Sequence, residues 1–150
     1  MKTKFLLPII IILIALLMAF IIVDSSRKKF NYIGLWKPIK HVESDIIGLP
    51  NSEISNLMKS TVSLNESTFI FFGEKSIKPK YTLHKEQTIE FINSNYRIDS
   101  KKLGLSKDSI QVLTVDLPAS DPMPPIDFII FENKMIVNND GVFIFLEKIK

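Results

Sequence analysis

Cysteine is absent from the 150 residues, and the chain has only five glycines and two histidines. The absence of cysteine excludes disulfide scaffolds, zinc-thiolate sites and cysteine nucleophiles. The few glycines, with no heptads and no internal period, exclude collagen, coiled coils and repeat arrays. A hydrophobic fraction of 46% and a net charge of +3 exclude a mainly disordered protein. The length suits one domain with a short appendage.

An uncharged run, FLLPIIIILIALLMAFIIV, occupies residues 5–23. As a helix it would be about 28 Å long, close to the hydrocarbon thickness of a bilayer. Lys2 and Lys4 precede it, and three basic residues follow at 27–29. The pattern predicts a signal anchor over residues 1–29, a transmembrane helix that holds the protein in the inner membrane with its domain outside the cytoplasm.

A cleaved signal peptide is the alternative interpretation of this segment. Cleavage after Ser25 would release a periplasmic or secreted protein. The run is longer than the apolar core of about 7–15 residues that such peptides use, and bulky residues follow Ala19. The anchor is therefore the favoured interpretation.

Charge is nearly balanced beyond this run. Two of the 19 basic residues precede it, which leaves 17 against 16 acidic residues. Apart from the three basic residues at 27–29, lysines and acidic residues are interspersed, a pattern typical of a solvated surface. The sequence therefore predicts no nucleic-acid partner, since such a partner requires a clustered basic face.

Short apolar segments separated by turn residues dominate residues 30–150. Strands are predicted at 61–64 and 68–72, joined by a turn at 65–67, and at 80–85 and 88–92 as a second hairpin. Further strands are predicted at 32–36, 110–117, 126–131, 134–137 and 142–149. A short helix beginning at Asn51 or Ser52 would bury Ile54, Leu57 and Met58. We expect an all-β fold, a small antiparallel barrel of about eight strands with one or two short helices, over residues 30–150.

Two of these strands are apolar on both faces. In TFIFF at 68–72 and VFIFL at 142–146, nearly every side chain is hydrophobic. A strand of this kind is covered on both sides. One side would face the barrel interior, and the other would meet a helix, the juxtamembrane segment or a partner.

The start of the first strand, Gly34-Leu35-Trp36, resembles the G-x-W signature of lipocalins, in which the tryptophan packs across one end of an antiparallel barrel. The later pattern is similar to that of small exported bacterial proteins with a lipocalin-like barrel. It includes Phe91, the segments 103–105 and 108–110, and the ending at 140–146. The residues that this resemblance assigns to the barrel end or core are Gly34, Trp36, Phe69, Phe71, Tyr81, Phe143 and Phe145.

Departures from the lipocalin pattern leave the nature of the interior open. The T-D-Y and late-arginine motifs of classical lipocalins are absent, and residues 32–150 are few for a full lipocalin. The eleven phenylalanines could fill the interior instead of lining a ligand cavity.

Motifs for catalysis are missing. The chain has no nucleophile elbow, P-loop, dinucleotide fingerprint or zincin helix. His41, Glu43 and Asp45 would share one face of an extended segment and are the one candidate metal cluster, but too few strong ligands accompany them. We predict a protein that is not an enzyme, with no catalytic residue, no metal and no cofactor.

Two hypotheses of function follow. The first is a membrane-tethered, non-catalytic protein-interaction module of the cell envelope, similar to inhibitor or immunity proteins. The second is a lipocalin-like binder of a small apolar ligand. An interior cavity above roughly 300 Å³ would favour the ligand hypothesis. A packed interior with an exposed aromatic patch would favour the protein partner.

Overall fold

The computed structural model describes residues 31–149. The described fold belongs to a compact unit that begins at Ile33. The predicted signal anchor at residues 1–29 lies outside the described residues. Within residues 31–149, no helix has both the length and the apolar character needed to cross a membrane.

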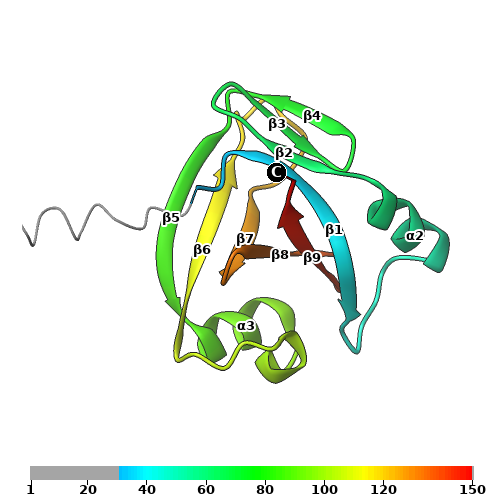
Figure 1. Cartoon of the computed structure of the whole chain (residues 1–150), viewed down its shortest axis with the longest axis vertical. Helices are drawn as coiled ribbons and strands as arrows, with labels where there is room; N and C mark the ends of the chain where they lie inside the picture. The colour runs from blue at the N-terminus through cyan, green and yellow to red at the C-terminus, as the bar shows by residue number, and fades with distance from the viewer. Residues whose placement is uncertain (1–30, 150) are drawn as a thin grey trace, which may run out of the picture. The chain divides into compact units, whose positions relative to one another are not determined.

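Nine antiparallel strands form a single sheet within residues 31–149, in the order β4-β3-β2-β1-β9-β8-β7-β6-β5. The sheet curls into a half-barrel, and β4 and β5 lie at its two ends (Figure 1). The predicted antiparallel, mostly β fold is confirmed. The strands are β1 (Gly34–Glu43), β2 (Val62–Leu64), β3 (Thr68–Phe71), β4 (Glu74–Ile77), β5 (Lys80–Gln87), β6 (Ser109–Asp116), β7 (Ile126–Phe131), β8 (Lys134–Asn139) and β9 (Val142–Lys148).

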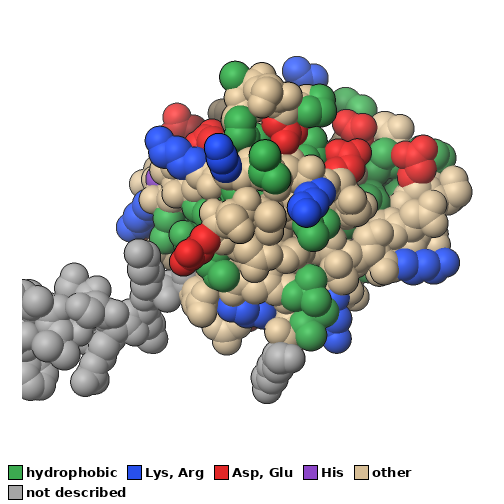
Figure 2. Space-filling view, turned by 90° about the horizontal axis from the view of Figure 1, so that it is seen from above, with side chains coloured by type: hydrophobic (Ala, Val, Ile, Leu, Met, Phe, Trp, Pro, Cys, Tyr) green, Lys and Arg blue, Asp and Glu red, His purple; other side chains and the backbone are tan. Residues whose placement is uncertain are grey.

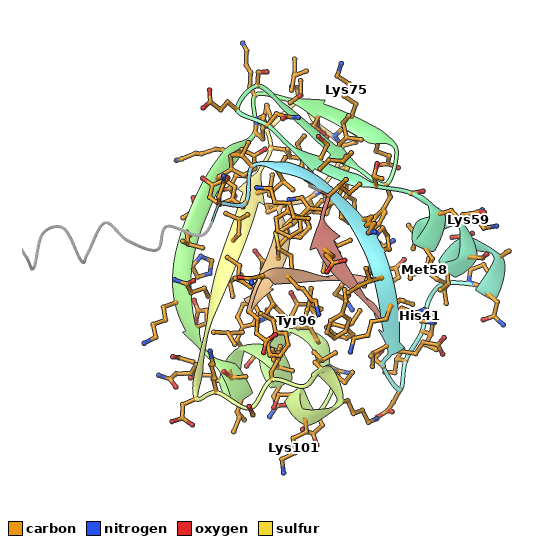
Figure 3. The ribbon with its side chains drawn as sticks, in the orientation of Figure 1. His41, Met58, Lys59, Lys75, Tyr96 and Lys101 are labelled. Atoms are coloured by element: carbon orange, nitrogen blue, oxygen red, sulfur yellow. The ribbon has the colours of Figure 1, made fainter. Side chains whose placement is uncertain are left out.

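Helices accompany the sheet at two places. Helix α2 (Asn51–Lys59) lies beside β1, and Met58 lies on the side of α2 nearest that strand (Figure 3). Ile54 is its buried residue. Helix α3 (Thr88–Tyr96) and the short 3₁₀ helix η1 (Ser100–Leu103) lie near the opposite end of the half-barrel from β3 and β4.

The predicted hairpin of 80–85 with 88–92 is wrong. The first strand continues to Gln87 and pairs with β6, and Thr88 then begins α3. Thr88 and Ile92 are buried, a spacing of four residues that places both on one helical face. Backbone bonds fix this change of direction, because Thr88 N–H donates to the carbonyl of Asp108 at 2.9 Å. Residues 93–109, where no strand or helix was predicted, contain the end of α3 and all of η1.

Two other strands differ from the prediction. Strand β1 does not end at residue 36, as predicted, but continues to Glu43, because an irregularity in its pairing with β9 between Pro38 and Lys40 accommodates the proline. Strand β4 was not predicted, since its sequence EKSI is mostly polar. It follows a tight turn in which Phe72 and Gly73 have φ of 48° and 101°. The strand predicted at 88–92 is lost and β4 is gained, and the described residues contain nine strands against the expected number of about eight.

Each face of the sheet has its own hydrophobic core. Cross-strand partners share a face, so Trp36, Val62 and Phe71 lie on one side, here called the Trp36 face. The other side, the Phe143 face, packs against α3 and η1. Its core consists of Ile92, Ile98, Leu103, Leu105, Ile110, Val112, Ile129, Ile136, Phe143 and Phe145.

Strand β9 therefore has the two-sided burial that its sequence predicts. Its residues from Val142 to Leu146 are all at most 1% exposed. Ile144 and Leu146 lie on the Trp36 face, and Phe143 and Phe145 contact the helical layer. A helix thus covers the second face of β9. Strand β3 is less completely covered, since Ile70 is half-buried.

Candidate functional site

Gly34 and Trp36 begin β1 on the Trp36 face. Trp36 is 1% exposed and pairs with Val62 and Lys148 on the neighbouring strands. Lys148 Nζ lies 5.8 Å from the centre of the indole ring. A Cβ at Gly34 would stand 2.6 Å from Lys148 Cε, so the glycine leaves the space that the lysine stem occupies. The G-x-W segment thus forms a packed cluster with the last residues of β9.

Phenylalanines from distant strands meet on the Trp36 face. Phe69 and Phe71 of β3 make edge-on contacts with Phe128 of β7, with ring centres 6.2 and 6.3 Å apart. Phe69 and Phe128 are fully buried. These rings pack together on the Trp36 face between β3 and β7.

Tyr81 joins the end strand β5 to the β2–β3 turn. Its hydroxyl donates a hydrogen bond to the carbonyl of Asn65 at 2.8 Å. Phe143 and Phe145, in contrast, lie on the opposite face from Trp36. Lys40 Nζ covers the Phe145 ring at 4.1 Å from its centre. The seven residues assigned by resemblance are therefore divided between two cores and do not form one site.

The candidate metal cluster is also divided. His41 Nε2 and Glu43 Oε1 lie 3.4 Å apart at the end of β1. Asp45 lies beyond the strand and accepts a hydrogen bond from Lys102 of η1 at 2.9 Å. Among residues 31–149, no group of three or more acidic, histidine or cysteine side chains is arranged to hold a metal ion.

A cleft of about 510 Å³ opens where β3 and β8 end and β7 begins. We call it the Tyr96 cleft. It was not predicted, because its residues come from five separate segments of the chain. The lining residues are Leu57, Phe71, Phe72, Glu74, Tyr96, Met123, Pro124, Pro125, Ile126, Asp127, Asn138, Asn139 and Asp140.

Three of the lining residues are carboxylates, and none is lysine, arginine or histidine. A second hollow of about 390 Å³ shares Tyr96, Asn138 and Asp140 with the cleft and adds Arg97. The face of the molecule seen in Figure 2 carries acidic, basic and hydrophobic side chains interspersed. The lining of the Tyr96 cleft differs from that mixture, since its charges are of one sign.

The β8–β9 turn contributes residues to both hollows. Asp140 and Gly141 have φ of 47° and 86°, as the Asn-Asp-Gly sequence predicts. The carbonyl of Asp140 accepts from Gly48 N–H at 2.9 Å, and that of Gly141 accepts from Ser44 N–H at 2.8 Å. These bonds attach the β8–β9 turn to the segment that follows β1.

Tyr96 projects from the end of α3 toward the sheet (Figure 3). Its ring packs edge-on against Phe143 at 5.3 Å and against Phe91 at 5.8 Å. Burial, reinforced by the charge of Asp127, raises the pKa of Tyr96 to about 12. Asp127 itself accepts a hydrogen bond from Thr114 Oγ1 at 2.6 Å. The Tyr96 hydroxyl is therefore neutral at physiological pH.

This shift of the Tyr96 pKa predicts a loss of stability in alkali. Because the pKa of Tyr96 in the folded protein exceeds the ordinary tyrosine value of 10.0, its contribution to stability is fully present below about pH 10 and is lost as the pH rises through about 12. The full loss is at most about 3 kcal/mol. Denaturant unfolding at several alkaline pH values should show that the free energy of unfolding falls more steeply with pH in the natural protein than in Tyr96→Phe. Equal slopes would contradict the assignment.

Comparison of the sequence with protein-family models and curated proteins, and of the fold with solved structures, gives no significant match.

Proposed function

We propose that this protein is a membrane-tethered, non-catalytic interaction module of the cell envelope that binds a protein partner through the Tyr96 cleft. The observation that carries the proposal is the cleft itself, whose lining combines aromatic side chains with carboxylates. Its volume of about 510 Å³ lies in the range of about 300–1,000 Å³ typical of small-molecule pockets and is ample for a side chain of a partner. A tether at residues 1–29 and a lipocalin-like barrel belong to the same proposal.

Packing within the sheet supports a partner at the surface. Phe69, Phe128 and Leu113 on the Trp36 face are completely inaccessible to solvent. Side chains of this size at this burial fill the space that a ligand would need. The cleft, in contrast, has half-buried aromatic residues in its wall, Phe71 and Phe72.

The second candidate is a lipocalin-like binder of a small apolar ligand, and the volume of the cleft also supports it. The two candidates differ in the mass of what is bound. A ligand of drug size is buried over most of its surface in its pocket. A protein partner needs about 800 Å² on each side, and the cleft would be the centre of that contact.

Native mass spectrometry of the full-length protein, purified in mild detergent from the cells that make it, tests this function. We expect an added mass of protein size, and we expect Met123→Trp to abolish it by filling the cleft. The matched control is Ile89→Trp, which adds the same ring at an α3 position that is 68% exposed and outside the cleft. An added mass of a few hundred daltons would support the apolar-ligand function instead. Binding unaffected by Met123→Trp would remove the cleft from the account.

A further inference from the structure

We infer that the Tyr96 cleft receives a lysine or arginine side chain from an extended segment of the partner. This inference rests on the proposed function and adds the chemistry of the partner. Its basis is the combination of three carboxylates, Glu74, Asp127 and Asp140, with an aromatic wall in one cleft.

The carboxylates come from three different turns or strand starts. Glu74 opens β4 and is the cross-strand partner of Phe71, so an acidic and an aromatic side chain share one face there. Asp127 is the second residue of β7, and Asp140 lies in the β8–β9 turn. Ladder and turn hydrogen bonds fix the backbone at these positions, and Thr114 also holds the Asp127 carboxylate, which limits where the negative charges can lie before a partner arrives.

The lining of the cleft includes no lysine, arginine or histidine, and Arg97 lines the adjoining hollow that shares Asp140 with the cleft. The hollow next to β5 provides a contrast, because its lining combines Lys85, Lys107 and Glu132. An acidic cleft attracts cationic groups and repels anionic lipid and nucleic acid. The occupant is therefore a basic protein segment and not a phosphate-bearing molecule.

The apolar wall suits the rest of a basic side chain. Phe71 and Phe72 lie 4.6 Å apart, between ring centres, beside Met123. Lysine and arginine bury an aliphatic stem against such surfaces while the charged end reaches polar groups. A cation near an aromatic face gains further attraction. Pro124 and Pro125 make the opposite edge stiff, so an extended backbone can lie along it.

Fluorescence anisotropy with labelled, end-blocked octapeptides tests this inference on the full-length protein in nonionic detergent. Three peptides are identical except at the central position, which is lysine, norleucine or glutamate. Norleucine has the stem of lysine without the charge. We expect the lysine peptide to bind at least about tenfold more tightly than the norleucine peptide, and the glutamate peptide to bind more weakly than both.

Two variants remove charge without disturbing the turns. Asp140→Asn suits the positive φ of 47°, and Asp127→Asn can still accept from Thr114. Each should weaken lysine-peptide binding about three- to tenfold. Glu132→Gln is the matched control, since Glu132 also has a positive φ, of 55°, and lies outside the cleft. It should leave binding unchanged.

Three results would overturn the inference. These are equal binding of the lysine and norleucine peptides, equal weakening by Glu132→Gln, and displacement of the lysine peptide by an equal concentration of spermidine. The last result would indicate a small polyamine instead of a protein side chain. The lysine peptide could fail to bind while native mass spectrometry still shows a protein-sized added mass that Met123→Trp abolishes. In that case this inference is wrong and the proposed function stands.

Discussion

Replacement of Trp36 with alanine is expected to lower the free energy of unfolding by about 3–5 kcal/mol, the loss typical of a large aromatic residue removed from a core. Trp36 is 1% exposed at the point where β1 pairs with both β2 and β9. Removal of the indole would therefore leave a cavity at the point where these three strands meet. Denaturant unfolding of the full-length protein followed by circular dichroism measures the change.

Fluorescence provides an independent readout of the same site. Trp36 is the one tryptophan of the chain, so its emission reports this environment alone. We expect a blue-shifted maximum in the folded protein and a shift to the red on unfolding. Trp36→Phe, which keeps a ring, should lose less stability than Trp36→Ala. A loss below about 1 kcal/mol in Trp36→Ala, or emission typical of water in the folded state, would contradict this role.

Gly141→Ala is expected to cost about 2–4 kcal/mol, because steric overlap adds to backbone strain. The added Cβ would overlap the carbonyl oxygen of Ile46 and stand 2.8 Å from Ser44 Oγ. The residue also has a φ of 86°, which side chains disfavour. The turn and the 44–48 segment would have to separate, which would alter the second hollow as well.

Gly73→Ala is the matched control for this prediction. Gly73 also has a positive φ, of 101°, but a Cβ there would meet nothing within 4 Å. Gly73→Ala is therefore expected to lose only the stability that backbone strain costs, about 1–2 kcal/mol. Thermal or denaturant unfolding of both variants separates the two contributions. Equal losses would show that the contact between the β8–β9 turn and the 44–48 segment does not stabilise the fold.

Local patterns predicted those elements whose signals are local. The hairpin of β2 and β3, the β7 strand and the Asn-Asp-Gly turn depend on alternation and turn residues within a few positions. The double coverage of β9 also followed from its sequence, because five consecutive apolar residues in a strand need cover on both sides.

The elements that were not predicted depend on tertiary contacts. A short apolar run such as 88–92 fits a strand or a helix, and the bond from Thr88 N–H to Asp108 lies outside the run itself. Strand β4 has a polar sequence and exists as the partner of β3. The Tyr96 cleft combines segments as distant as Leu57 and Asp140. No pattern within a single segment can predict such a site.

Site-specific photo-crosslinking in living cells tests the central claim most directly. Benzoylphenylalanine in place of Phe72 changes one aromatic side chain for a larger one in the wall of the Tyr96 cleft, and the same residue at Ile89 samples an exposed position outside it. The account predicts a discrete adduct with one protein from position 72 and none from position 89. Adducts with lipid or a small molecule alone, or the same protein bands from both positions, would contradict it.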